Sequence, residues 1–179
     1  MSQTTQTLDA ASGELQVITG TAGPAAKMGH RLTLAMRSWQ ATVQWTGKNP
    51  AAVELTVAVD SLQVLGGGGG VTPLTAPEKA VARSNALKSL DAKKFPRIRF
   101  TSEQISTTAD GYRLEGRLEI HGTSRPQTVD VTAHDDRTRL SAEVAVRQSD
   151  FGVKPYSLMM GALKVADEVT VRFNGTVSR

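Results

Sequence analysis

The chain has 179 residues, of which 39% are apolar and 21% are charged, so it fits a single globular domain and is not a disordered polyelectrolyte. It contains no cysteine, which excludes a disulfide scaffold, a Cys-based zinc site and a cysteine nucleophile. No apolar run approaches the roughly 18 residues of a transmembrane helix. Residues 1–13 lack the cations and the apolar stretch of a secretory signal, so we expect a cytoplasmic protein.

The first residues carry little patterning, and most of the remaining chain alternates between apolar and polar side chains. We expect a disordered tail over residues 1–12 and one domain over residues 13–179. A short segment around Leu15 and Val17 is a candidate strand. Stronger alternation with a period of two predicts eight further strands. They cover residues 31–37, 39–45, 53–60, 97–101, 112–121, 128–134, 140–147 and 169–177.

Half-buried strands joined by short turns predict an antiparallel all-β sheet, because parallel strands read as continuous apolar runs. A sheet of this size either closes into an eight-stranded barrel or splits into a sandwich. The predicted inward positions are mostly Val, Ala and Gly, and such small side chains favour a barrel with room for one small ligand. A two-layer sandwich packed solid by the same residues is the alternative.

Two segments interrupt the strands. The glycine run 66–70 predicts a flexible loop tip, and the sequence from Thr75 to Glu78 matches a capping box, so a short helix is expected from there to about Leu90. The segment 150–166 has no clear alternation and carries much apolar surface, including Met159 and Met160. These methionines would form either an adaptable lid at one mouth of the barrel or a plug at its end.

No motif assigns a catalytic residue or a metal site. His30, His121 and His134 lack the spacing of zinc ligands, and there is no nucleophile elbow or phosphate-binding loop. The net charge of +4 raises the question of a nucleic-acid partner. However, the outward cations are interspersed with Glu and Asp, and the aromatic residues fall mostly in the inward phase, so we expect no nucleic-acid binding.

Three segments resemble a known family. They are Leu90 to Phe100 with its Phe-Pro-Arg-Ile-Arg-Phe ending, Leu114 to Pro126 with Leu-Glu-Ile-His-Gly, and Arg147 to Val153 followed by Asp167-Glu-Val. Together they resemble the YceI-like family of bacterial polyisoprenoid-binding proteins. The resemblance implies a lipocalin-like barrel of eight antiparallel strands whose tunnel holds an isoprenoid lipid, such as a quinone or a prenyl phosphate. It implies a binding protein without enzymatic activity or other cofactor.

The inward phase and the resemblance together give a set of candidate ligand-binding residues. The apolar tunnel is expected to be lined by Leu34, Met36, Trp39, Val57, Phe100, Leu118, Ile120, Val131, Val144 and Phe173, with Met159 and Met160 at one end. Candidate partners of a lipid head group are Lys79, Arg83 and Lys154.

The expected partner is a small apolar lipid, with transient membrane contact and a monomeric or homodimeric state. Two alternatives remain. One is an enzyme on the same barrel that uses His30 or His121, and the other is a scaffold with a filled core that acts through its surface.

Overall fold

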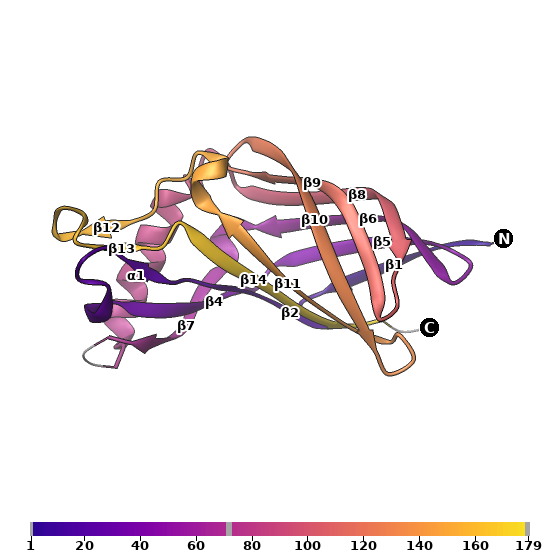
Figure 1. Cartoon of the computed structure of the whole chain (residues 1–179), viewed down its shortest axis with the longest axis horizontal. Coiled ribbons are helices and arrows are strands. Elements are labelled where there is room, and N and C mark those ends of the chain that lie inside the picture. The colour runs from indigo at the N-terminus through magenta and orange to yellow at the C-terminus, as the bar shows by residue number, and fades with distance from the viewer. Residues whose placement is uncertain (1, 71–72, 178–179) are drawn as a thin grey trace.

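The computed structural model describes residues 2–70 and 73–177, with the backbone alone at Met159. Most of the chain is strand, with one α-helix (Figure 1). The strands are β1 (Gln3–Asp9), β2 (Gly13–Ile18), β3 (Thr21–Ala22), β4 (His30–Met36), β5 (Trp39–Thr46), β6 (Asn49–Ala58), β7 (Leu62–Gly69), β8 (Arg97–Thr107), β9 (Gly111–Ile120), β10 (Thr123–His134), β11 (Arg139–Arg147), β12 (Ser157–Leu158), β13 (Leu163–Val165) and β14 (Glu168–Thr176). The helices are α1 (Ala76–Ser89) and the short 3-10 helices η1 (Ala26–Met28), η2 (Val59–Ser61), η3 (Gln148–Phe151) and η4 (Met159–Gly161).

Eleven strands form one antiparallel sheet in the order β1-β5-β6-β8-β9-β10-β11-β14-β2-β4-β7. Several of these strands are consecutive parts of one longer strand. β1 and β2 follow one another along one edge of β5 and β4, and β6 and β7 follow one another along the other edge of the same two strands. Residues 3–18, 30–46 and 49–69 are therefore three long, broken strands. With the other five strands they close a ring of eight, because β2 also pairs with β14. The predicted antiparallel barrel is confirmed.

Two of the breaks form one shared bend. The amide of Ala58 donates to the carbonyl oxygen of Ser38 at 3.0 Å, and the amide of Arg37 donates to that of Ser61 at 3.3 Å. The hydrogen bonding thus continues across the bend between two neighbouring strands. The alternation of apolar and polar side chains is interrupted at such a bend. For this reason the sequence predicts two strands where the structure has one long, bent strand.

The disordered tail predicted over residues 1–12 is wrong for Gln3–Asp9, which forms β1 against β5. Leu8 is buried at 3% exposure, and Gln6 accepts a hydrogen bond from the indole N–H of Trp45. Apart from Leu8 the segment is Gln, Thr and Asp, so it carries no apolar alternation. It is ordered because it completes the wall of the barrel.

The prediction that the glycine run 66–70 forms a loop tip is also wrong for most of the run. Gly66 to Gly69 belong to β7 and pair with His30 to Thr33 of β4. The helix α1 follows, with the predicted capping box at its start, where the hydroxyl of Thr75 accepts from the amide of Glu78 and the Glu78 carboxylate accepts from the amide of Thr75. It packs against β7 on the side where that strand has no further strand partner. No described helix has the length and apolar character needed to cross a bilayer.

Two segments distant in sequence meet at the α1 end of the barrel, and we call them the cap: residues 19–31 and 152–166. They contain η1, η4 and a separate small sheet of order β12-β13-β3. The amide of Ala25 donates to the carbonyl oxygen of Ala162 at 2.7 Å, and that of Ala166 to Gly20 at 3.0 Å. Gly23 is required at this junction, because its φ is +90° and a Cβ there would lie 2.5 Å from the Ala162 oxygen. Figure 1 shows α1, β12 and β13 at one end of the molecule and β1 at the other.

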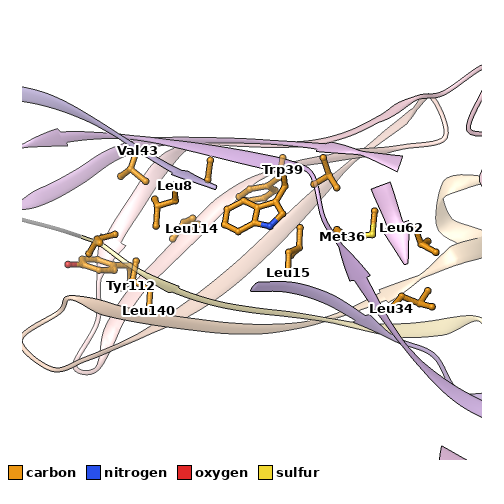
Figure 2. Close-up of a cluster of buried hydrophobic side chains, with 14 of the residues drawn as sticks. Leu8, Leu15, Leu34, Met36, Trp39, Val43, Leu62, Tyr112, Leu114 and Leu140 are labelled. Atoms are coloured by element: carbon orange, nitrogen blue, oxygen red, sulfur yellow. The ribbon is translucent and has the colours of Figure 1, made fainter. Parts of the chain in front are cut away.

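The buried apolar side chains form a column along the barrel axis. Figure 2 shows Trp39 between Met36 and Leu62 on one side and Tyr112 and Leu140 on the other. These residues belong to one cluster, and Val146, Phe151 and Val153 form a second cluster near the cap. The alternation of the strands thus places their apolar faces inward, as predicted.

Candidate ligand-binding site

The barrel encloses a cavity of about 960 Å³. All eight barrel strands contribute to its lining, together with α1 and the cap. This volume lies at the upper end of the range of about 300–1,000 Å³ that is usual for small-molecule sites. The interior is therefore not filled by its own side chains.

The structure places nine of the ten predicted tunnel residues on the cavity wall. These are Leu34, Met36, Val57, Phe100, Leu118, Ile120, Val131, Val144 and Phe173. Trp39 is the exception, since it is buried but does not line the cavity. Its ring meets Phe173 edge-on with 5.6 Å between centroids, so it supports the wall from within the packed cluster. Its indole N–H has no hydrogen-bond partner among the described residues.

The cavity is closed at the end that carries β1. Its lining there consists of buried side chains, including Leu8, Trp45, Tyr112 and Leu140. The rings of Trp45 and Tyr112 pack edge-to-face at 6.4 Å. The guanidinium of Arg137 lies 5.1 Å above Tyr112 and donates to the carbonyl oxygen of Gly111. An apolar chain that enters the barrel would end against this aromatic group.

The opening lies at the opposite end. Six residues that line the cavity are also exposed, which marks where the cavity meets solvent. They are Met28, Leu158 and Lys164 of the cap and Pro77, Glu78 and Val81 of α1. We call this group the mouth. No lining residue from the barrel strands β5 to β11 is exposed, so the cavity has one open end.

Polar side chains of the lining gather near the mouth and are few elsewhere. His30, Asn85, Gln148 and Lys164 all line this part of the cavity. Gln148 donates from its amide to the carbonyl oxygen of Ala166 at 3.1 Å, which fixes it beside the cap. Sequence reasoning assigned none of these four to the head-group set, because they come from four separate segments. The position of His30 at the start of a predicted strand was the one available signal.

The head-group candidates from the sequence are not brought together. Arg83 donates to the carbonyl oxygens of Leu62 at 2.8 Å and Asp60 at 2.6 Å, so it holds α1 against the bend before β7. Lys79 is partly exposed on α1 and Lys154 is exposed in the cap, and neither lines the cavity. Met160 is fully exposed at the turn between β12 and β13, so it is neither a plug nor a lid. The side chain of Met159 lies outside the described part of the structure.

The charge at the mouth is set by local hydrogen bonds. The hydroxyl and amide of Thr75 donate to Glu78 and lower the pKa of that carboxyl, with a smaller contribution from His30. The carboxylate therefore remains ionised. His121 lies outside the cavity, with its ring 4.6 Å from that of Phe95. Over residues 2–70 and 73–177, no group of three or more acidic or His side chains could hold a metal ion.

A closed antiparallel barrel with one open end and an apolar cavity defines a barrel of the lipocalin type. The YceI-like domain model matches residues 6–177 of this chain. The chain belongs to the YceI-like family.

Individual relatives agree with this assignment. The chain is 29% identical over 86 residues to UPF0312 protein YE1254 of Yersinia enterocolitica, and this match spans 46% of the chain and only 38% of that relative. Among solved structures, BcnA of Burkholderia cenocepacia has a TM-score of 0.70 at 21% identity, with 96% of this chain and 99% of that chain covered. The YceI protein of Campylobacter jejuni has a TM-score of 0.57 at 14% identity, with 82% and 85% covered. These structures support the fold.

Proposed function

We propose that the protein binds and carries, or sequesters, an isoprenoid or similar long apolar lipid inside the barrel and performs no chemistry on it. The observation that carries this proposal is the apolar cavity of about 960 Å³ with a single open end. Polyisoprenoid binding is also the type of activity for which the YceI-like family is known, and the family match covers residues 6–177.

The distribution of polar groups gives the lipid a direction. The tail would extend to the aromatic group formed by Trp45 and Tyr112, where the wall is apolar and buried. A quinone or phosphate head group would remain near the mouth, beside His30, Asn85 and Lys164. Transfer of each buried methylene from water contributes about 0.8 kcal/mol, so a few isoprene units suffice for tight binding once association costs are met.

Two features argue against the alternatives. A filled scaffold would not leave a cavity of this size, because protein interiors are close-packed. An enzyme that uses His121 would need that side chain in the cavity, and it lies outside. His30 does line the cavity, but it sits near the mouth, where it suits recognition of a head group.

The proposal is tested by native mass spectrometry and organic extraction of the purified protein, followed by titration with farnesol and geranylgeraniol. We expect a stoichiometric co-purified lipid, or saturable binding that is tighter for geranylgeraniol because it has one more isoprene unit to bury. A protein that is empty on isolation and binds neither alcohol would overturn the proposal.

A further inference from the structure

The exposed apolar side chains of the molecule are concentrated around the mouth. Met28, Leu158 and Met160 belong to the cap, with exposures of 54%, 48% and 107%. Val81 of α1 and Leu65 of β7 are the other large apolar side chains that are exposed among the described residues, and Figure 1 shows both elements at the same end. Three of the five, Met28, Val81 and Leu158, also line the cavity. The apolar interior therefore continues directly onto this surface.

Met160 is fully exposed to solvent at one end of the molecule. It lies at the turn between β12 and β13, with φ of +57°, and it makes no contribution to the core. In Figure 1 this turn is at the end of the molecule, beyond α1 and β13. A fully exposed methionine at a hairpin tip serves no packing purpose, and exposed apolar groups that cluster at one surface mark an interaction site.

The charge of the molecule is divided in the same way. The cap has four cations, Lys27, Arg31, Lys154 and Lys164, and no Asp or Glu. Together with residues 75–90 it contains seven cations and one carboxylate, which leaves fourteen cations and sixteen carboxylates in the rest of the chain. The net charge of +4 is thus a strongly positive end combined with a slightly negative remainder.

The cap cations also differ from the other cations in their ion pairing. All five ion pairs found among residues 2–70 and 73–177 use arginines outside the cap, such as Arg113 with Asp130 at 2.8 Å and Arg99 with Glu54 at 2.9 Å. Within the same described residues none of the four cap cations forms an ion pair. Five arginines outside the cap thus have a carboxylate partner, whereas the four cap cations have none among the described residues and remain available to an external anion.

We propose that the cap, with Met28, Leu158 and Met160 as its apolar contacts, is the surface by which the protein docks onto an anionic lipid bilayer. The apolar side chains would enter the acyl boundary, and the four cations would meet the phosphates of anionic lipids. This orientation places the mouth against the bilayer, so a lipid can pass into the barrel without exposing its chain to water. This docking goes beyond the proposed lipid binding. It rests on that function only for the reason why the mouth should face a bilayer.

The test uses vesicles of phosphatidylcholine, with and without phosphatidylglycerol, and separates bound from free protein by flotation. We expect binding to the anionic vesicles that weakens with salt, and much weaker binding to pure phosphatidylcholine. The double variant Lys27→Gln/Arg31→Gln should bind anionic vesicles about thirtyfold more weakly, since each cation near an anionic surface contributes about fivefold. Lys48→Gln, at the exposed β5–β6 turn of the closed end, is the matched control and should bind like the wild type.

The apolar contact is tested at Met160, which does not line the cavity. Met160→Trp should show a blue-shifted emission on addition of anionic vesicles, whereas Thr107→Trp in the exposed part of β8 should not. Met160→Ser should weaken vesicle binding several-fold, and Met160→Leu should restore it. Equal binding to both vesicle types, or wild-type binding by Met160→Ser together with Lys27→Gln/Arg31→Gln, would overturn the docking proposal.

Geranylgeraniol uptake from solution distinguishes this proposal from that of lipid carriage. Uptake without vesicle binding overturns the docking surface and leaves the carrier function intact. Vesicle binding by a protein that takes up no geranylgeraniol supports the docking surface and overturns the carrier function.

Discussion

The most direct test of the cavity is to fill it from its wall. Val144 lies in β11, is partly buried and lines the cavity, and its neighbour Ala145 is exposed on the outer face of the same strand. We expect Val144→Trp to reduce binding of geranylgeraniol strongly and Ala145→Trp to leave it unchanged. The two variants introduce the same side chain at adjacent positions, so they differ only in the face that receives it.

The expected size of the effect follows from the apolar area that the ligand would lose. Trp has roughly seven heavy atoms more than Val, and we expect it to displace about four methylene-sized groups of the ligand. At about 0.8 kcal/mol for each group the loss is about 3 kcal/mol, or roughly a hundredfold in Kd. Because the indole ring would enter open space, the free energy of unfolding should fall by no more than about 1 kcal/mol, which corresponds to a Tm shift of about 2–4 °C.

Binding is measured by filtration with radiolabelled geranylgeraniol, and folding by circular dichroism. The same substitution at Leu118 on β9 should act in the same direction, since that side chain also lines the cavity. A folded Val144→Trp protein whose Kd stays within about threefold of the wild type would show that the ligand does not occupy this cavity.

Three further predictions concern stability. Gly116→Ala should lower the free energy of unfolding by about 2 kcal/mol or more in urea titrations, because its Cβ would lie 2.1 Å from a carbonyl oxygen of the adjacent strand, whereas Gly66→Ala, with no atom within 4 Å, should not be destabilising. Thr75→Ala should cost about 1 kcal/mol by removing the cap of α1, and an unchanged Tm would contradict that role. The hydrogen bond from the Ser149 hydroxyl, followed by that from its amide, lowers the pKa of Asp167 below its usual value. The folded form therefore gains stability from Asp167 above the ordinary carboxyl pKa of about 4, and this gain is lost as pH falls. The Tm difference between wild type and Asp167→Asn should narrow below about pH 4, and a constant difference down to pH 2 would refute this origin.

How far the sequence predicts the site is clearest on the barrel wall. Side-chain orientation in a strand has a period of two, so Leu118 and Val144 can be assigned to the inner face without knowing their neighbours. Trp39 follows the same alternation and points inward, but it packs against Phe173 and does not line the cavity. The alternation of a strand tells which face of the sheet a side chain points to. Only the tertiary packing decides whether that side chain fills the interior or borders the cavity.

The head-group candidates lie apart from the cavity for a related reason. Arg83 was chosen for its charge and its place on a predicted helix, yet its guanidinium is engaged by two carbonyl oxygens at the bend before β7. His30 and Lys164, which do line the cavity, are far apart in the sequence. They converge because β13 pairs with β3 and closes the cap, a contact that no local pattern encodes.

The sequence by itself determined the all-β class, the inward and outward faces of the strands, and the start of α1 at its capping box, because each depends on neighbouring residues. Tertiary structure decided that Gln3–Asp9 is a strand, because this polar segment becomes ordered only through hydrogen bonds to the edge of β5. It also decided that the glycines of β7 pair with β4, and that two acid-free segments meet at one mouth. Closure of the ring depends on hydrogen bonds between residues distant in the chain. Hence the open end, and the charge gathered around it, became visible only in the folded barrel.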